Sequence, residues 1–205
     1  MENNIILYGA SGHCKVIIDI LQSNNQIIET IIDDAPKSNT ILGFSIVNSN
    51  EFRFSSSQNM ILSIGNNKVR KKLASKLMVN FVTAIHPKAI ISNSAIIGKG
   101  SVIMAGAIVN PDTKIGEHCI INSGSVVEHD CVINDFVHIS PNASLAGGVI
   151  VGEGSQIGIG ATIIQGIKIG KQVTIGAGTV VISDVPDYSV IVGNPGRIIK
   201  VNENE

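Results

Sequence analysis

A six-residue period runs through the second half of the chain without a single interruption. From Ile91 to Val181 every sixth residue is Ile, Leu or Val, at sixteen positions in succession. Four residues after each of them stands a small or β-branched residue, beginning with Ala95. This repeat predicts a left-handed parallel β-helix, in which three hexads form one triangular coil and the aliphatic side chain points inward. Sixteen hexads correspond to a little over five coils.

The composition agrees with a core of this shape. Hydrophobic residues make up 44% of the 205 residues, whereas aromatic residues make up only 3% and Trp is absent. A narrow triangular core has room for Ile and Val but not for large rings, and 21 glycines suit its many tight corners. Cys119 and Cys131 fall in the small inward series, so we expect them to be packing residues and not nucleophiles.

Composition also excludes several classes of protein. A chain that is 44% hydrophobic and only 15% charged is not intrinsically disordered. No stretch reaches the roughly 18 apolar residues of a membrane-spanning helix, and residues 1–4 lack the basic start of a signal peptide. The net charge of −1 gives no reason to expect a nucleic-acid partner. Three cysteines without metal-like spacing indicate a reducing cytoplasm.

The segment before the repeat has the pattern of a small α/β domain. We expect this domain at residues 1–84, the β-helix at 85–190 and a C-terminal tail at 191–205. An apolar run at 4–9 leads into a Gly-rich turn and then a helical pattern, an arrangement that cradles phosphates at a helix N-terminus. The turn has the GxxG spacing and not the full dinucleotide fingerprint, and about 80 residues are too few for a full two-half dinucleotide fold, so we do not expect NAD. Its residues are Gly9, Ala10, Ser11, Gly12 and His13.

Two further predicted strands of this domain end in small or polar residues. The strand at 29–32 leads into Asp33 and Asp34, and the strand at 60–64 leads into Gly65. Ligands of open α/β sheets bind beyond the carboxyl ends of the strands, which favours a small nucleotide-like ligand here. The two aspartates suit either ribose or sugar hydroxyls, or a turn or helix cap. The helix that follows Gly65 is expected to expose a basic face to solvent: Lys68, Arg70, Lys71, Lys72 and Lys76.

Five histidines are candidates for acid–base chemistry. His13 lies in the Gly-rich turn, where it could contact a ligand, and His86, at the domain junction, is expected to be structural. The register of the hexads places His118 and His129 in corners of the β-helix. His138 directly precedes an inward residue, so its side chain is expected to point outward, toward a neighbouring chain or a groove.

His129 differs from the other histidines in its neighbours, Glu128 and Asp130. A carboxylate that holds one imidazole nitrogen fixes the tautomer and raises the basicity of the other nitrogen, which can then accept a proton from a nucleophile. The alternative interpretation is a solvated polar corner. On the residues alone, both interpretations of this tripeptide remain open.

Several motifs together resemble a known family. They are Gly-Ala-Ser-Gly-His-x-Lys (9–15), Ile-Asp-Asp (32–34), Ile-Gly-Asn-Asn (64–67), Ile-His-Pro (85–87), Glu-His-Asp (128–130), Val-His-Ile-Ser-Pro (137–141) and Gly-Asn-Pro-Gly-Arg (193–197). In this order they resemble the sialic acid O-acetyltransferases and bacillosamine-pathway N-acetyltransferases, which are left-handed β-helix enzymes. The resemblance implies acetyl transfer from acetyl-CoA to the amino group of a nucleotide-linked amino sugar, in bacterial surface glycan biosynthesis, by a homotrimer with sites between protomers.

The same resemblance assigns roles to individual residues. His129 corresponds to the general base and Asp130 to its acidic helper, a position where some members of the family have Glu. His138 matches a residue near the thioester, and Gly147 and Ala177 match backbone contacts to the coenzyme. The nucleotide-sugar pocket is matched by Gly9, Ala10, Ser11, Gly12, His13, Asp33, Asp34 and Gly65.

Three other functions are compatible with the chain. The acceptor can be a hydroxyl group, as on sialic acid, and the residues do not decide between an amine and a hydroxyl. A non-catalytic nucleotide-sugar-binding protein is a second alternative. A metal site, as in β-helix carbonic anhydrases, is disfavoured because the helix histidines are separated by 11 and 9 residues and not by whole coils. We therefore expect no metal, and the nucleotide and sugar stay open.

Overall fold

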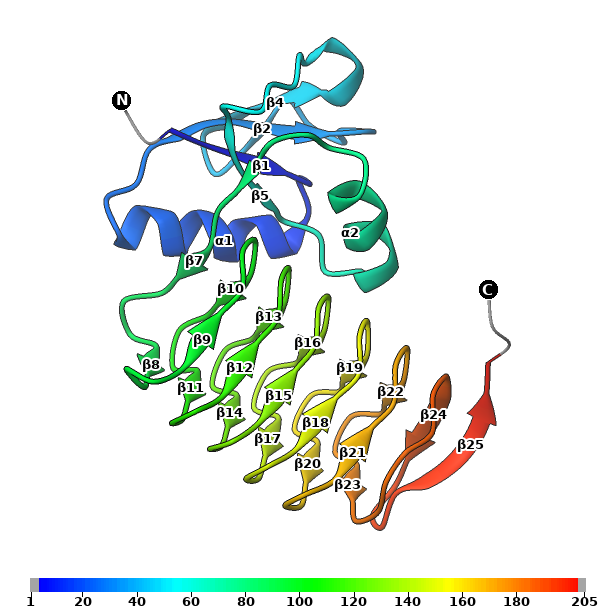
Figure 1. Cartoon of the computed structure of the whole chain (residues 1–205). Coiled ribbons are helices and arrows are strands. Elements are labelled where there is room, and N and C mark those ends of the chain that lie inside the picture. The colour runs from blue at the N-terminus through cyan, green and yellow to red at the C-terminus, as the bar shows by residue number, and fades with distance from the viewer. Residues whose placement is uncertain (1–3, 203–205) are drawn as a thin grey trace.

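The computed structural model describes residues 4–202 as a small α/β domain followed by a long β-helix (Figure 1). The domain has one six-stranded sheet in the order β3-β4-β2-β1-β5-β6, which is parallel except for the β3–β4 hairpin. Its strands are β1 (Ile5–Tyr8), β2 (Ile28–Asp33), β3 (Thr40–Ile41), β4 (Phe44–Asn48), β5 (Asn59–Leu62) and β6 (Asn80–Phe81), with a short 3-10 helix, η1 (Ser49–Glu51), after β4. The sequence pattern predicted β1, β2 and β5 but not the β3–β4 hairpin.

Two helices connect this sheet to the β-helix. α1 (Gly12–Ser23) lies between the sheet and the first coils, and α2 (Asn67–Ala74) lies beside the next coils (Figure 1). The buried face of α1, including Ile17 and Leu21, forms one apolar cluster with Val102, Met104 and Ile120 of the β-helix. The two units therefore share a hydrophobic interface. Neither helix, among residues 4–202, is long and apolar enough to cross a membrane.

The β-helix consists of two-residue strands in three parallel faces. Face 1 contains β7 (Ala84–Ile85), β10 (Val102–Ile103), β13 (Ile120–Ile121), β16 (His138–Ile139), β19 (Gln156–Ile157) and β22 (Thr174–Ile175). Face 2 contains β8 (Ile90–Ile91), β11 (Ile108–Val109), β14 (Val126–Val127), β17 (Ser144–Leu145), β20 (Thr162–Ile163) and β23 (Val180–Val181). Face 3 contains β9 (Ile96–Ile97), β12 (Lys114–Ile115), β15 (Val132–Ile133), β18 (Ile150–Val151) and β21 (Lys168–Ile169).

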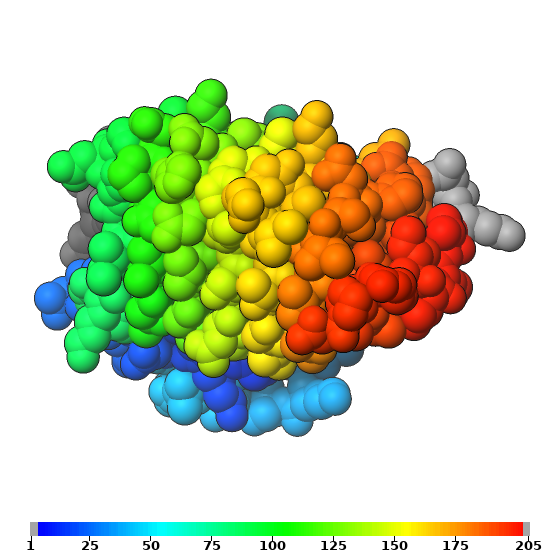
Figure 2. All heavy atoms as spheres, turned by 90° about the horizontal axis from the view of Figure 1, so that it is seen from below, coloured from blue at the N-terminus to red at the C-terminus, as the bar shows by residue number. Residues whose placement is uncertain are grey.

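Each coil pairs in register with the residues 18 positions later, as Val102 pairs with Ile120 and Val126 with Ser144. The repeat begins one hexad earlier than Ile91, because Ile85 of β7 already pairs with Ile103. At the other end, β24 (Ser189–Val192) extends face 1 and β25 (Arg197–Val201) pairs with it antiparallel. In the space-filling view the coils follow one another in sequence order from green to red (Figure 2).

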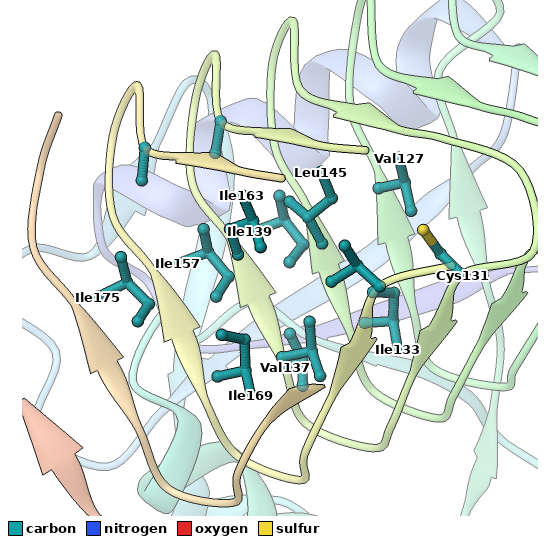
Figure 3. Packing of buried hydrophobic residues seen from close by; sticks show 14 of the residues in the cluster. Val127, Cys131, Ile133, Val137, Ile139, Leu145, Ile157, Ile163, Ile169 and Ile175 are labelled. Carbon is teal, nitrogen blue, oxygen red and sulfur yellow. The ribbon is translucent and has the colours of Figure 1, made fainter. Parts of the chain in front are cut away.

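The inward aliphatic residues form a continuous core along the axis of the β-helix (Figure 3). Ile133, Ile139 and Leu145, one from each face, are at most 1% exposed. Each such side chain contributes roughly 1.5–3 kcal/mol of burial free energy. Cys119 and Cys131 are fully buried beside them, as predicted. The predicted fold class, a parallel β-helix preceded by a small α/β domain, is confirmed.

Candidate active site

The Gly-rich turn joins β1 to α1 at the carboxyl end of the sheet. Gly9 has a φ of +110°, and a Cβ there would lie 2.7 Å from Ile64 Cγ1 and 3.0 Å from the carbonyl oxygen of Ser63. Only glycine fits both this backbone conformation and this close approach. The buried Ser63 hydroxyl lies 2.6 Å from the Gly9 carbonyl oxygen. The turn is therefore held from the end of β5.

The two aspartates after β2 hold the turn and the adjacent loop. Asp33 accepts hydrogen bonds from the backbone N–H groups of Ala10 (2.8 Å) and Ala35 (2.9 Å). Asp34 accepts from the hydroxyls of Ser49 (2.6 Å) and Tyr8 (2.5 Å), and these bonds lower the pKa of Asp34. Sequence patterns left these aspartates open between a turn role and a ligand role. The structure gives them turn and loop contacts, and Ser49 and Tyr8 are partners that the sequence did not indicate.

A hollow of about 320 Å³ opens beside the turn. It is lined by Ala10 of the turn, by Lys15 of the first turn of α1, and by Lys37 and Ser38 after β2. Ser11, the N-cap of α1, makes no side-chain capping bond. The helix N-terminus and two lysines give this hollow a positive potential that suits phosphate groups. Lys15 stood within the quoted Gly-turn motif, but Lys37 carried no signal in the sequence.

His13 and His138 face each other across the boundary between the α/β domain and the β-helix. Their ring centroids are 6.5 Å apart, His13 in the first turn of α1 and His138 on β16 of face 1. Burial, reinforced by the positive charge of Arg70, lowers the pKa of each imidazole to about 4. Both histidines are therefore neutral at physiological pH.

Each of these histidines keeps one ring nitrogen without a partner. The amide nitrogen of Asn122 lies 3.0 Å from His138 Nε2, so Nε2 accepts and the proton is on Nδ1. His13 Nε2 is buried without a hydrogen-bond partner among residues 4–202, and His138 Nδ1 makes no hydrogen bond of ordinary geometry there, although the backbone of Gly65 is close enough to act on the pKa of His138. Buried polar atoms are normally paired, but His118 Nδ1 at the same boundary is also unpaired, so an unpaired nitrogen does not by itself mark a ligand contact.

His129 and Asp130 form a polar corner between β14 and β15. His129 Nδ1 lies 2.8 Å from Asp130 Oδ2, and the side chains are 61% and 66% exposed. The hydrogen bond that His129 donates to Asp130 raises the pKa of His129. Gly147, one coil later, lies directly against the ring, because a Cβ there would come within 2.6 Å of His129 Cε1. With Nδ1 bound to the carboxylate, Nε2 is the nitrogen available to accept a proton.

His129 and the pair formed by His13 and His138 lie on opposite sides of the β-helix. The corner of His129 joins faces 2 and 3, whereas His138 lies on face 1, under the α/β domain. Ala177 lies in the corner that follows β22 of face 1 and is exposed. A single chain thus brings His13 and His138 together with the Gly65 turn but leaves His129, Asp130 and Gly147 at a separate corner.

The expectation of a fully exposed basic face on α2 is wrong for Arg70. Its side chain is 1% exposed and donates hydrogen bonds to carbonyl oxygens on both sides of the domain boundary. Lys71, the next residue, remains half exposed and forms a 2.5 Å ion pair with Glu153 of the β-helix. Spacing alone does not reveal which charged residue of a helix a second domain will cover.

His118 and His86 have structural environments. The His118 ring is stacked on Phe136 (centroids 5.2 Å apart) and meets Phe81 edge-on, and burial lowers its pKa to about 4. His86 Nδ1 accepts the backbone N–H of Lys88 at 3.0 Å.

A larger groove, of about 660 Å³, lies between α2 and the later coils. It is lined by Lys71, Lys72, Lys171 and Tyr188 among others and contains none of the predicted site residues. The histidines described above therefore do not line this groove. Within residues 4–202, no three His, Cys, Asp or Glu side chains are placed to hold a metal ion.

Family models match both parts of the chain. Residues 4–77 match the PglD N-terminal domain, and residues 94–129 and 112–147 match the bacterial transferase hexapeptide repeat. A histidine variant of perosamine N-acetyltransferase from Caulobacter crescentus, solved with CoA and GDP-perosamine, is 35% identical, with a TM-score of 0.89 over 96% of this chain and 97% of that one. The chain belongs to the hexapeptide-repeat acyltransferase family.

Other members of the family support the same placement. The acetyltransferase domain of PglB from Neisseria gonorrhoeae, also solved with acetyl coenzyme A, is 35% identical with a TM-score of 0.89, over 96% of this chain and 100% of that domain. UDP-N-acetylbacillosamine N-acetyltransferase of Bacillus subtilis is 42% identical over 120 residues, which is 50% of this chain. That alignment spans about half (51%) of the length of this curated relative.

Proposed function

We propose that the protein is an acetyl-CoA-dependent N-acetyltransferase that acts on the amino group of a nucleotide-linked amino-deoxy sugar. The observation that carries the proposal is the His129–Asp130 pair, with Nδ1 held at 2.8 Å and the imidazole otherwise exposed. A base with a raised pKa at an open corner suits an acceptor that arrives from solvent or from a neighbouring chain. Relatives solved with CoA and GDP-perosamine support the substrate class.

We assign nucleotide-sugar binding to residues 1–84 and acetyl transfer to residues 85–190. The Gly9–His13 turn and the hollow lined by Lys15 and Lys37 suit the diphosphate. Asp33 and Asp34 act indirectly, because their carboxylates hold the turn and the loop that frame this hollow. Gly65 follows β5, the strand beside β1, and we assign it to the same binding region, outside the hollow itself.

The protonation states of His129 and His138 indicate which nitrogen accepts and which donates a proton in the chemical step. The sugar amine attacks the acetyl carbonyl carbon and forms a C–N bond, while His129 Nε2 takes the proton that the amine loses. The imidazolium is stabilised by Asp130 at Nδ1. His138 Nδ1–H is a neutral donor for the oxyanion. Collapse of the tetrahedral intermediate breaks the C–S bond, and the CoA thiolate receives the proton from His129.

No cysteine takes part in this scheme. Cys14, Cys119 and Cys131 are free and buried, and burial raises the pKa of Cys14 to about 11 and that of Cys119 to about 12. Thiols with such pKa values are poor nucleophiles at neutral pH. Direct transfer without a covalent enzyme intermediate is therefore the chemistry we assign. Free thiols also suit the reducing cytoplasm, where we place the protein.

We further propose a homotrimer in which neighbouring chains share each active site. His129 lies on the corner opposite the face that carries His138, so a site containing both needs two chains. A threefold arrangement would bring the corner of one protomer, with His129, Asp130 and Gly147, to the domain boundary of the next. Acetyl-CoA would then lie between protomers, along His138 and Ala177 of one and Gly147 of the other.

The proposal is tested with purified protein, acetyl-CoA and a panel of UDP-, dTDP- and GDP-linked amino sugars together with sialic acid. Mass spectrometry should show a gain of about 42 Da, one acetyl group, on a nucleotide amino sugar. His129→Ala should abolish this gain and preserve the oligomer and nucleotide-sugar binding. Acetylation of sialic acid alone would make the protein an O-acetyltransferase, and binding without transfer would make it a non-catalytic binding protein. Near-normal turnover by His129→Ala would refute the assigned base.

A further inference from the structure

Arg70 connects the α/β domain to the β-helix through a buried guanidinium group. On the domain side it donates to the carbonyl oxygens of Ile64 (2.9 Å) and Gly65 (3.3 Å) and to Asn67 Oδ1 (2.8 Å). On the β-helix side it donates to the carbonyl oxygens of His118 (2.8 Å) and Phe136 (3.0 Å). A guanidinium group has five N–H donors, so every donor has an acceptor.

This group is unusual in having no carboxylate among its hydrogen-bond partners in residues 4–202. Burial lowers the pKa of Arg70 to about 10, so the group still carries its charge at neutral pH. A buried charge is costly, and five oxygen dipoles are the compensation here. Lysine, with three donors on a single atom, cannot satisfy the same five oxygens.

We propose that Arg70 is a positioning residue for nucleotide-sugar binding, which fixes the Gly65 turn against the coil that leads into His138. Gly65 lies three residues after the end of β5, and Phe136 lies two residues before His138. Two hydrogen bonds of one guanidinium group, to the carbonyl oxygens of Gly65 and Phe136, therefore hold the Gly65 turn at a fixed distance from β16, the strand that carries His138. The inference rests on the proposed function, because the proposed function assigns the Gly65 turn to nucleotide-sugar binding.

The charge of Arg70 acts on the same place. It lowers the pKa of His13, His138 and His118, in each case adding to the effect of burial. No such effect of Arg70 acts on His129, whose pKa is raised by Asp130. The guanidinium thus helps to keep His13 and His138 neutral, and it adds positive potential at the domain boundary.

The test compares Arg70→Lys and Arg70→Gln with Lys71→Ala as the matched control. Lys71 is the next residue of α2 and also bridges the two domains, but through an exposed ion pair. We expect Arg70→Lys to raise the KM for the nucleotide amino sugar about tenfold or more and to leave the KM for acetyl-CoA within about twofold. Lys71→Ala should leave both within about twofold. An unchanged nucleotide-sugar KM in Arg70→Lys would overturn the inference, as would an equal loss for both substrates.

A second readout does not depend on turnover. In Arg70→Gln, histidine NMR titration should show higher pKa values for His13 and His138, while His129 serves as an internal control that stays unchanged. Calorimetric titration with UDP and GDP should show weaker binding to Arg70→Lys than to the wild type. If the wild type acetylates no nucleotide amino sugar, the proposed function fails, and these two measurements still decide the role of Arg70.

Asn67→Ala provides a milder variant in case the Arg70 variants do not fold. It removes one of the five acceptors of Arg70, together with hydrogen bonds from Asn67 Nδ2 to the carbonyl oxygens of Gly154 and Ser155. The same selective rise in nucleotide-sugar KM is expected, at a smaller size. Equal effects on the two substrates in this variant would contradict a positioning role.

Discussion

His129 Nδ1 and Asp130 Oδ2 are 2.8 Å apart at an exposed corner, although the two residues are adjacent in sequence. Neighbouring side chains in an extended strand point to opposite sides and rarely meet. Here the backbone turns, and Asp130 adopts a φ of +61°, in the left-handed region that short polar residues tolerate. The corner of the β-helix is what converts a sequence neighbour into a hydrogen-bond partner.

This contact predicts the pH dependence of Asp130→Asn. The base is active when deprotonated, and Asp130 raises the pKa of His129, so its removal should move the acidic limb of the kcat/KM profile to lower pH. The maximal rate should fall roughly 10- to 100-fold, because the weaker base also loses its fixed tautomer. Glu128→Gln, which changes the other flanking carboxylate, is the control and should keep most of the rate. An acidic limb that stays in place in Asp130→Asn would argue against the pair.

The position of Gly147 predicts a steric effect on catalysis. An alanine Cβ would lie 2.6 Å from His129 Cε1, and the exposed ring can move aside without disturbing the fold. Gly147→Ala should therefore lower kcat roughly 100-fold, as expected for a displaced catalytic group, and leave the melting temperature nearly unchanged. Acetyl-CoA affinity should also change little, since alanine retains the backbone N–H. In a His129→Ala background the same substitution should have no further effect on the residual rate.

The separation of His129 from His138 predicts complementation between inactive variants. When His129→Ala and His138→Ala chains are unfolded and refolded together at equal ratio, a shared site is intact only where one chain supplies His129 and the next supplies His138. In randomly mixed trimers about a quarter of the sites meet this condition. Recovery of about a quarter of the wild-type activity would support sites between chains. Mixtures with no more activity than the separate variants would contradict them.

Buried His118 predicts a pH dependence of stability. Its pKa is about 4 in the folded protein, whereas an unfolded histidine titrates near 6.5, so between these values only the unfolded state binds the proton. The free energy of unfolding should rise with pH from 4 to 6.5 and level off above. His118→Phe keeps a ring between Phe81 and Phe136 and removes the titrating group. The rise in the free energy of unfolding between pH 4 and 6.5 should therefore be smaller by roughly 1–3 kcal/mol in this variant. Denaturant unfolding at several pH values measures it, and an unchanged slope would refute the prediction.

The sequence predicted the β-helix so well because its determinants are local. An inward aliphatic residue and a small residue recur within each hexad, so every coil has the same sequence pattern. The first hexad, which was not predicted, has the pattern too, with Ile85 and Ala89. The β3–β4 hairpin was not predictable from the sequence, because its strands are short and their residues show no clear alternation. Local patterns and the geometry agree wherever the contacts lie within one coil.

The environment of Arg70 was not predictable in this way. The four basic residues of α2 and Lys76 just beyond it have the pattern of a solvent-exposed face, and nothing in that pattern distinguishes the buried Arg70 from the exposed lysines. Its acceptors, the carbonyl oxygens of His118 and Phe136, belong to coils far away in the sequence. The pairing of His13 with His138 has the same origin. Contacts between two packed domains leave no repeating pattern in the sequence from which they could be predicted.

The uninterrupted coils have a consequence for how such proteins can change. Neighbouring coils are about 4.8 Å apart, the spacing of paired strands, and all of them present equivalent corners. His129 and Gly147 lie at the same corner of successive coils. A histidine placed 18 residues later would therefore have the same orientation on the next coil. The distance between the nucleotide pocket and the catalytic base can therefore change in steps of one coil. Acceptors of different length can be accommodated when the base moves to another coil while the fold stays the same.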